Sequence, residues 1–215
     1  MTETPDVTKP RTRADGERTR RLILDAAVRL ATVEGLDGLS IGTLARATGH
    51  SKSGVYAHFD SKEALQLATI DTARALFIDV VVAPALHQRG LDRLRALCES
   101  FLTYVENRTL PGGCFFAAAA AELGGRPGPL RQRVAANQKD WISVLTEAAN
   151  EAVALGELRD DTDVATLVFE LNALVIAANT AYILHDDPAV LIRARTAIDR
   201  VTLAATPALE PAQST

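Results

Sequence analysis

The sequence of 215 residues lacks the patterns that several classes of protein need. Its two cysteines, Cys98 and Cys114, are too few for a disulfide framework and have no metal-ligand spacing. The four histidines are scattered along the chain, also without such spacing. No nucleophile elbow, GxGxxG, phosphate loop or HExxH motif is present, so we expect no enzyme, no metal site and no cofactor.

Aromatic residues are scarce too, at 5% of the chain, whereas Ala, Leu and Val dominate. Glycine and proline are concentrated in a few places, which favours long helices. The longest apolar run, residues 164–184, still contains Glu170, Asn172 and Asn179, side chains that are costly in hydrocarbon. We therefore expect a buried helix there and no membrane partner. The N-terminal residues MTETPDVTKPRTR lack the apolar segment of a signal peptide, so a cytoplasmic protein is predicted.

The net charge of −4 is unevenly distributed. Residues 9–62 contain 10 Lys and Arg against 6 Asp and Glu, whereas the remainder contains 13 against 21. A basic N-terminal quarter on an acidic body is typical of a nucleic-acid-binding module joined to a part that does not touch DNA. Random scatter of charge could give the same difference, so the asymmetry supports this interpretation without deciding it.

Residues 40–62, SIGTLARATGHSKSGVYAHFDSK, predict a helix, a tight turn, a second short helix and the start of a third. Gly49 suits the left-handed conformation that ends a helix, and Ser51 is an N-cap candidate for the next one. Two short helices joined at a Gly-containing turn form the helix-turn-helix pattern. Spacing alone is equally compatible with an ordinary corner between two helices whose polar face is solvated.

The second short helix has two different faces. Val55 and Phe59 share one side, whereas Ser53 and Ala57 point roughly the other way. An exposed face without carboxylates suits insertion into the major groove of DNA, which admits one helix. The predicted DNA-binding residues are those of this exposed face together with candidate phosphate contacts at its edges: Ser40, Thr43, Ser51, Lys52, Ser53, Gly54, Tyr56, Ala57, His58 and Lys62.

The segment SKSGVYAHFDSKEAL closely resembles the recognition-helix signature of the TetR/AcrR family of bacterial transcriptional regulators. ILDAAVRLATVEGLDGLSI is similar to the family's first-helix pattern, although Ala31, Leu36 and His50 depart from its usual residues. The fold expected is all-α, with an N-terminal three-helix helix-turn-helix DNA-binding domain at residues 16–62. A C-terminal helical ligand-binding and dimerisation domain follows at residues 63–206.

Polar composition predicts that both ends of the chain are disordered, at residues 1–15 and 207–215. The first could be a basic arm that contacts DNA or simply a solvated tail. Helical patterns are predicted over residues 17–34, 62–82, 91–107, 130–155, 163–185 and 189–205, with a further short helix in CFFAAAAAEL. The inward-facing stripe of the first is expected to be Leu22, Ile23, Ala26, Ala27 and Leu30. Nothing interrupts the pattern at 62–82, so we expect one continuous helix that acts as a lever between the domains.

The helix at residues 163–185 is apolar on two faces, and such a helix must be covered twice. We expect it to form the dimer interface with the helix at 189–205, as a four-helix bundle with the symmetry mates. A single deeply buried hairpin is the alternative. The family resemblance also implies a homodimer.

The resemblance further implies a C-terminal cavity for a small apolar or amphipathic effector. Aromatic candidates for its lining are Phe77, Phe101, Tyr104, Phe115, Phe116 and Trp141, and polar candidates are Glu122, Asn137 and Asn172. Any one of these aromatic residues could instead be plain core. Cys114 could lie at a helix N-terminus, where the dipole favours the thiolate of a redox sensor, or be a buried inert thiol.

Together these features predict a dimeric DNA-binding transcriptional regulator, a repressor that a small-molecule effector releases from a pseudo-palindromic operator. Its partners would be double-stranded operator DNA, the effector and a second copy of the chain. The alternative is a helical small-molecule or cysteine-based redox sensor that does not bind DNA. The steep salt dependence of duplex binding separates the two, because phosphate contacts release counterions.

Overall fold

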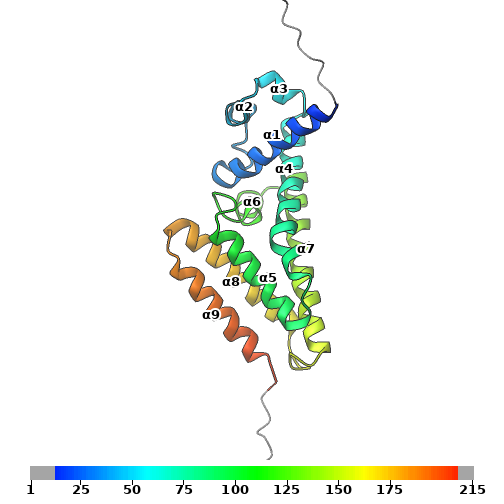
Figure 1. Ribbon diagram of the computed structural model, residues 1–215, viewed down its shortest axis with the longest axis vertical. Helices are drawn as coiled ribbons and strands as arrows, with labels where there is room; N and C mark the ends of the chain where they lie inside the picture. The colour runs from blue at the N-terminus through cyan, green and yellow to red at the C-terminus, as the bar shows by residue number, and fades with distance from the viewer. Residues whose placement is uncertain (1–12, 208–215) are drawn as a thin grey trace, which may run out of the picture.

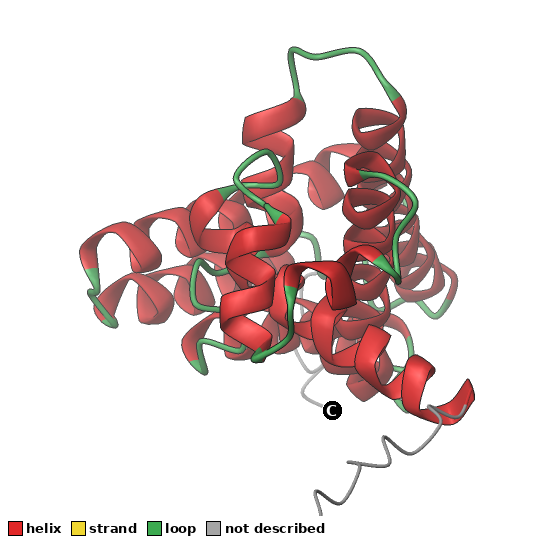
Figure 2. Ribbon diagram, turned by 90° about the horizontal axis from the view of Figure 1, so that it is seen from above, coloured by secondary structure: helices red, strands yellow, loops and turns green. Residues whose placement is uncertain are grey.

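The computed structural model describes residues 13–207, and all the regular secondary structure in that range is helical (Figures 1 and 2). This confirms the all-α fold class. The elements are α1 (Arg13–Glu34), α2 (Ile41–Thr48), α3 (Lys52–Tyr56), α4 (Lys62–Phe77), η1 (Ile78–Val82), η2 (Ala83–Ala85), α5 (Gly90–Glu106), α6 (Phe115–Leu123), α7 (Pro129–Ala154), α8 (Val164–His185) and α9 (Ala189–Ala204).

The helices α1, α2 and α3 form one end of an elongated molecule (Figure 1). Helix α4 leaves this end and packs along α7, while α8 and α9 pair with each other on the other side of α5. Helix α6 lies directly below α1 and also packs on α7. It is therefore placed between the N-terminal helices and the rest of the protein.

Side-chain caps fix the short helices of the N-terminal end. The Ser40 hydroxyl accepts a hydrogen bond from the Thr43 amide at 3.1 Å, and the Ser51 hydroxyl accepts one from the Gly54 amide at 3.0 Å. Gly49 ends α2 with a φ of 68°, in the left-handed region that glycine enters without steric cost. The predicted turn and N-cap between α2 and α3 are confirmed.

Helix α1 differs from the prediction at its start and in its buried face. It begins at Arg13, so the expected disorder of residues 13–15 is wrong, whereas the rest of the predicted arm and residues 208–215 lie outside the described part of the chain. Leu22, predicted to face inward, is 50% exposed. The buried stripe is Ile23, Leu24, Ala27, Val28 and Ala31. It turns this way because α1 packs on α2, α4 and α6 at once.

The predicted continuous helix at residues 62–82 is also wrong in detail. The α-helical hydrogen bonding of α4 ends at Phe77, and the π-helical η1 and the 3₁₀ segment η2 carry the chain to Ala85. A π-helical turn widens the helix by one residue, and such turns occur often at functional sites. Hydrophobic periodicity cannot reveal it, because the pattern of residues Ile78–Val82 fits an α-helix equally well.

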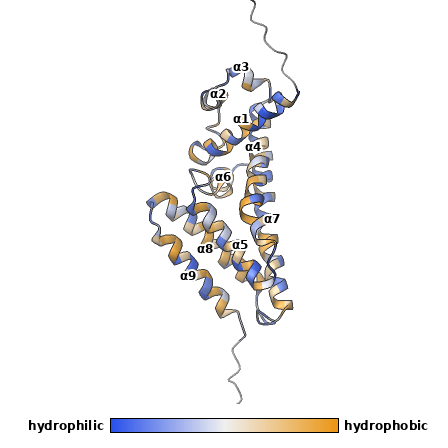
Figure 3. Ribbon diagram, viewed as in Figure 1, coloured by the Kyte–Doolittle hydropathy of each residue, from blue (hydrophilic) through white to orange (hydrophobic). Residues whose placement is uncertain are grey.

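Helix α8 is long and apolar enough, by length and composition alone, to cross a membrane. Leu171 and Val175, on one of its faces, are completely buried against neighbouring helices. Its other side carries Phe169 and Leu184, which are 72% and 73% exposed. Orange segments on both α8 and α9 show the apolar character of this hairpin (Figure 3). In a single chain, therefore, only one of the two apolar faces is covered.

Candidate nucleic-acid interface and cavity

The faces of α3 lie as predicted from the sequence. Val55 is fully buried and Phe59 is 6% exposed, so both belong to the core of the N-terminal helices. Ser53 and Ala57 are exposed on the other side, beside Tyr56 at 63% exposure. The helix has only five residues and few internal hydrogen bonds. Its N-terminal cap at Ser51 stabilises it by adding one more.

A hollow of about 340 Å³ joins α3 to the starts of α2 and α4. It brings together four of the predicted DNA-binding residues, Ser40, Lys52, Tyr56 and Lys62. The first turn of α2 also borders it, and free amides at a helix N-terminus attract anions. Two lysines and a helix N-terminus around one hollow suit a phosphate group.

The other predicted contacts are placed differently. Ser51 is exposed, and Gly54 is half-buried where its amide donates to that serine. The Thr43 hydroxyl donates to the Ser40 carbonyl at 2.8 Å within the capping box, so it is engaged inside α2. His58 is half-buried, with its ring packed edge-on against Phe59 at a centroid distance of 6.5 Å. DNA contact by any of these residues stays a prediction.

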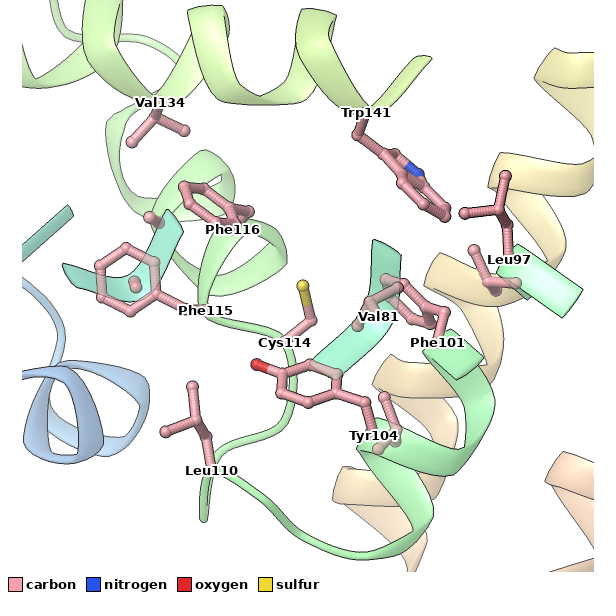
Figure 4. Packing of buried hydrophobic residues seen from close by; sticks show 14 of the residues in the cluster. Val81, Leu97, Phe101, Tyr104, Leu110, Cys114, Phe115, Phe116, Val134 and Trp141 are labelled. Atoms are coloured by element: carbon pink, nitrogen blue, oxygen red, sulfur yellow. The ribbon is translucent and has the colours of Figure 1, made fainter. Parts of the chain in front are cut away.

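A second hollow of about 440 Å³ lies between η1 and helices α4, α5, α6, α7 and α8. Its walls are mainly apolar and include four of the predicted aromatic residues, Phe77, Phe101, Phe116 and Trp141. The rings of Phe77 and Trp141 meet nearly perpendicularly, with centroids 5.4 Å apart. Figure 4 shows Trp141 extending from α7 toward Phe101. The size and lining are those of a small-molecule site.

Three of the residues predicted to bind ligand do not line this cavity. Tyr104 is buried beside it, and burial raises the pKa of its hydroxyl above the ordinary value. Phe115 packs against Phe116 at a centroid distance of 5.3 Å and lies on the side nearer α1 (Figure 4). Successive residues of a helix point about 100° apart, so only one of this pair can face the cavity. The third is Glu122, whose side chain leaves the cavity altogether.

The Glu122 carboxylate instead binds the loop between α1 and α2. Its two oxygens accept hydrogen bonds from the backbone amides of Leu36 and Asp37, both at 2.8 Å. The carbonyls of the same two residues are held from α4, by the Gln66 amide at 2.8 Å and the Lys62 ammonium at 2.7 Å. We call this set of five residues the loop clamp. It fixes the backbone of Leu36 and Asp37, in the loop before α2, between α6 and α4.

Further contacts tie the N-terminal helices to the helical body, among them one between Gly112 and α1. The Gly112 amide donates to the Thr32 hydroxyl at 3.1 Å, and a Cβ at Gly112 would lie 1.9 Å from the Thr32 carbonyl oxygen. Only glycine therefore allows this close approach to α1. Arg126 also pairs with Asp37, beside the loop clamp.

Family models match both parts of the chain. Residues 23–69 match the model for bacterial regulatory proteins of the tetR family, and residues 90–198 match the tetracyclin repressor-like C-terminal domain. The chain belongs to the TetR family. It is accordingly a DNA-binding transcriptional regulator, which confirms the resemblance seen in the sequence.

Curated relatives and solved structures agree with this assignment. The HTH-type transcriptional regulator SrpR of Pseudomonas putida is 26% identical over 168 residues, which cover 77% of this chain and 75% of that protein. A TetR regulator from Chloroflexus aurantiacus is 28% identical, with a TM-score of 0.81 over 88% of this chain and 95% of that one. AibR, solved with isovaleryl coenzyme A and operator DNA, has a TM-score of 0.67 over 88% and 99%. At 23% identity, AibR is similar in fold alone.

The cysteines of this TetR-family regulator suit packing and not redox chemistry. Cys114 is the N-cap of α6, as the sequence suggested, and it is 2% exposed. Burial raises the pKa of its thiol to about 11, although the amides of Phe116 and Ala117 act in the opposite direction. Burial likewise raises the pKa of Cys98 to about 12. Neither side chain is therefore the thiolate that reacts with oxidants and electrophiles near neutral pH.

Several residues of the two sites had no signal in the sequence. Gln66 and Glu122 contact residues 30 and 86 positions away, and helical periodicity carries no information about such pairs. Ala117 and Ala120 line the cavity, yet their side chains resemble any other in the alanine run of α6. Arg74 and Asp140 form an ion pair of 3.1 Å at the cavity, which only the packing of α4 on α7 creates.

Proposed function

We propose that this regulator is a dimeric repressor that leaves a pseudo-palindromic operator when a small-molecule effector fills the cavity. The observation that carries the proposal is the position of α6. This helix contributes Phe116 and Ala120 to the cavity wall and, half a turn later, Glu122 to the loop clamp. A ligand that moves α6 therefore acts directly on the loop that precedes α2.

In the DNA-bound state, the exposed side of α3 faces the bases. Ser53 and Ala57 read the major groove, while Lys52, Tyr56 and Lys62 bind phosphates around the hollow that they share. Two copies of α3 then enter successive major grooves, about 34–36 Å apart, on one face of the duplex. We place this activity in the cytoplasm, where bacterial operators are found.

The second copy is proposed to pack on α8 and α9. Besides Phe169 and Leu184, the outer side of this hairpin carries Ile192 and Leu203, which are 63% and 66% exposed. Large apolar side chains gathered on one element are typical of an interface, and a two-fold symmetric contact buries each of them twice. A four-helix bundle formed by two hairpins is the arrangement that we expect.

Release follows if the effector binds the two conformations unequally. A ligand shifts an equilibrium only by the difference between its affinities for the two states. Phe77 of α4 and Phe116 of α6 both line the cavity, so a ligand there touches both helices that hold the loop clamp. Displacing α6 relative to α4 moves α2 and α3 away from the spacing that the operator requires. AibR, in complex with both isovaleryl coenzyme A and operator DNA, supports a fold able to hold both kinds of partner.

A duplex-binding assay tests this proposal against the alternative of a sensor that does not bind DNA. Genomic fragments captured by the purified protein provide the duplex, and fluorescence anisotropy then measures its affinity at increasing salt. We expect a logarithmic salt dependence with a slope of roughly −0.9 for each phosphate contacted. Affinity that is absent, or that does not respond to salt, would instead favour the alternative.

A further inference from the structure

The wall of the cavity includes a residue, Asn137, with a buried hydrogen-bond acceptor that has no partner among the described residues. Asn137, on α7, is 8% exposed, and its Nδ2 donates to the Arg133 carbonyl at 2.8 Å. This bond fixes the orientation of the side-chain amide, because the oxygen cannot replace the nitrogen as donor. Its Oδ1 atom is buried and accepts no hydrogen bond from any residue in the range 13–207. Such an atom is rare in proteins, because burying an unpaired acceptor destabilises the fold.

A second asparagine supplies the complementary group. The Trp141 indole N–H can only donate, and it donates to Oδ1 of Asn172 at 3.0 Å. The Nδ2 of Asn172 is thereby left as a donor, and it has no hydrogen-bond partner among the described residues. Asn137 and Trp141 are one turn apart on the same face of α7. Asn137 and Asn172 therefore belong to one wall of the cavity, formed by α7 and α8.

The other residues that line the cavity carry no net charge. Its charged residues are Arg74 and Asp140, which pair with each other and whose side chains are 48% and 60% exposed. The rings of Phe77, Phe101 and Phe116, the uncharged amide of Gln138 and small or aliphatic side chains complete the walls. A charged ligand would lose its hydration here without gaining a free partner of opposite charge.

We infer that the cavity takes an uncharged, largely apolar molecule with an N–H or O–H donor, and that Asn137 selects this donor. The inference rests on the proposed function, since it names the chemical class of the effector for the same cavity. The apolar part of the molecule contacts the aromatic walls, and its polar edge faces α7 and α8. The donor of the ligand hydrogen-bonds to Asn137. The affinity is therefore higher than burial of apolar surface alone would give.

Two matched probes test the inference. N-phenyl-1-naphthylamine is uncharged, carries one N–H donor and becomes fluorescent in apolar surroundings, whereas its N-methyl derivative keeps both ring systems without the donor. Trp141 is the only tryptophan of the chain and lines the cavity, so quenching of its emission by energy transfer reports entry. We expect the first probe to bind about tenfold more tightly, the effect of one hydrogen bond to a buried group.

Substitution then assigns this preference to one residue. Asn137→Leu has a similar volume and removes the acceptor, so the ratio of the two affinities should fall to about one. The matched control is Gln132→Leu, which alters an exposed polar residue of α7 outside the cavity lining and should leave the ratio unchanged. Because Asn137→Leu also removes an unpaired buried atom, its melting temperature should be equal to or above that of the parent. If this variant does not fold, the two probes on the unaltered protein decide the question.

The possible failures are distinguishable. Equal affinities for the two probes in the unaltered protein would overturn the selection of a donor and leave the proposed repressor intact. A preference that persists in Asn137→Leu would overturn the role of this residue. Failure of both probes to quench Trp141 would overturn the inferred ligand class and also remove a support of the proposed function, while duplex binding would remain to be judged by its own assay.

Discussion

At the scale of residues, the surface around α3 divides into side chains that can bind phosphate and side chains that can reach bases. Lys52, Tyr56 and Lys62 meet around one hollow, while Ser53 and Ala57 lie on the exposed side of the helix. Phosphate contacts position a protein on DNA without reading its sequence, and contacts to base edges provide specificity. Substitutions in the two groups should therefore have different consequences.

We expect Lys52→Ala and Tyr56→Phe to weaken binding to all duplexes alike, and the lysine change to reduce the salt slope by about one. Substitutions at Ser53 or Ala57 should instead change which captured duplex is preferred. Gel-shift titrations on two unrelated captured fragments provide the measurement. If all these variants bound both fragments as the parent does, the assignment of contacts to α3 would be wrong.

The buried thiols give a prediction at the same scale. The pKa of Cys114 is raised by burial from 9.0 to about 11, so the unfolded chain loses its proton first as the pH rises. The contribution of this thiol to stability is therefore complete below pH 9 and is lost as the pH rises toward 11. At pH 8, iodoacetamide should modify neither cysteine of the folded protein and both cysteines in denaturant, as mass spectrometry can count. Rapid alkylation of the folded protein would revive the redox alternative.

At the scale of elements, α6 and the start of α4 act together on the loop that precedes α2. Helix α6 binds the two backbone amides through Glu122, and α4 binds the two carbonyls through Gln66 and Lys62. Both helices also line the cavity. A ligand in the cavity is therefore expected to change the position of the helix-turn-helix.

The variant Glu122→Gln tests this connection. A glutamine has one acceptor oxygen and would turn its amide nitrogen toward the second backbone N–H, so one hydrogen bond of the loop clamp is lost. Hydrogen exchange at the amides of Leu36 and Asp37 should become about tenfold faster, and affinity for captured duplex should fall. Quenching of Trp141 by the naphthylamine probe should be unaffected.

Glu147→Gln, an exposed change on α7, is the matched control and should alter neither exchange nor duplex binding. Unchanged exchange at residues 36 and 37 in Glu122→Gln would contradict the role given to the loop clamp.

Local features of these elements can be predicted from the sequence more reliably than the contacts between them. The capping Ser51 and the left-handed Gly49 follow from rules that act over a few residues, and both were predictable. The π-helical turn of η1 was not, because its residues fit an α-helix equally well. Glu122 was assigned to the cavity because a lone acidic residue in an alanine-rich helix gives no indication of the loop that it meets 85 residues earlier.

At the scale of the whole molecule, the uncovered side of α8 and α9 determines the proposed assembly. Phe169→Glu or Ile192→Glu would place a carboxylate inside the proposed four-helix bundle. Burial of an unpaired charge costs several kcal/mol, so the dimer dissociation constant should rise by roughly a hundredfold or more. Sedimentation velocity over a range of concentrations measures it.

Leu86→Glu, which changes an apolar side chain of 56% exposure outside α8 and α9, should leave the dimer unaffected. A parent protein that remains monomeric at high concentration would contradict the proposed interface.

The most direct test of the central claim is the stoichiometry and salt dependence of binding to one captured genomic duplex. Sedimentation of the complex gives the number of chains bound, and anisotropy at increasing salt gives the electrostatic part of the affinity. We predict two chains on each site and an affinity that falls steeply and linearly on logarithmic axes as salt rises. One chain on each site, or binding that is indifferent to salt, would contradict the account.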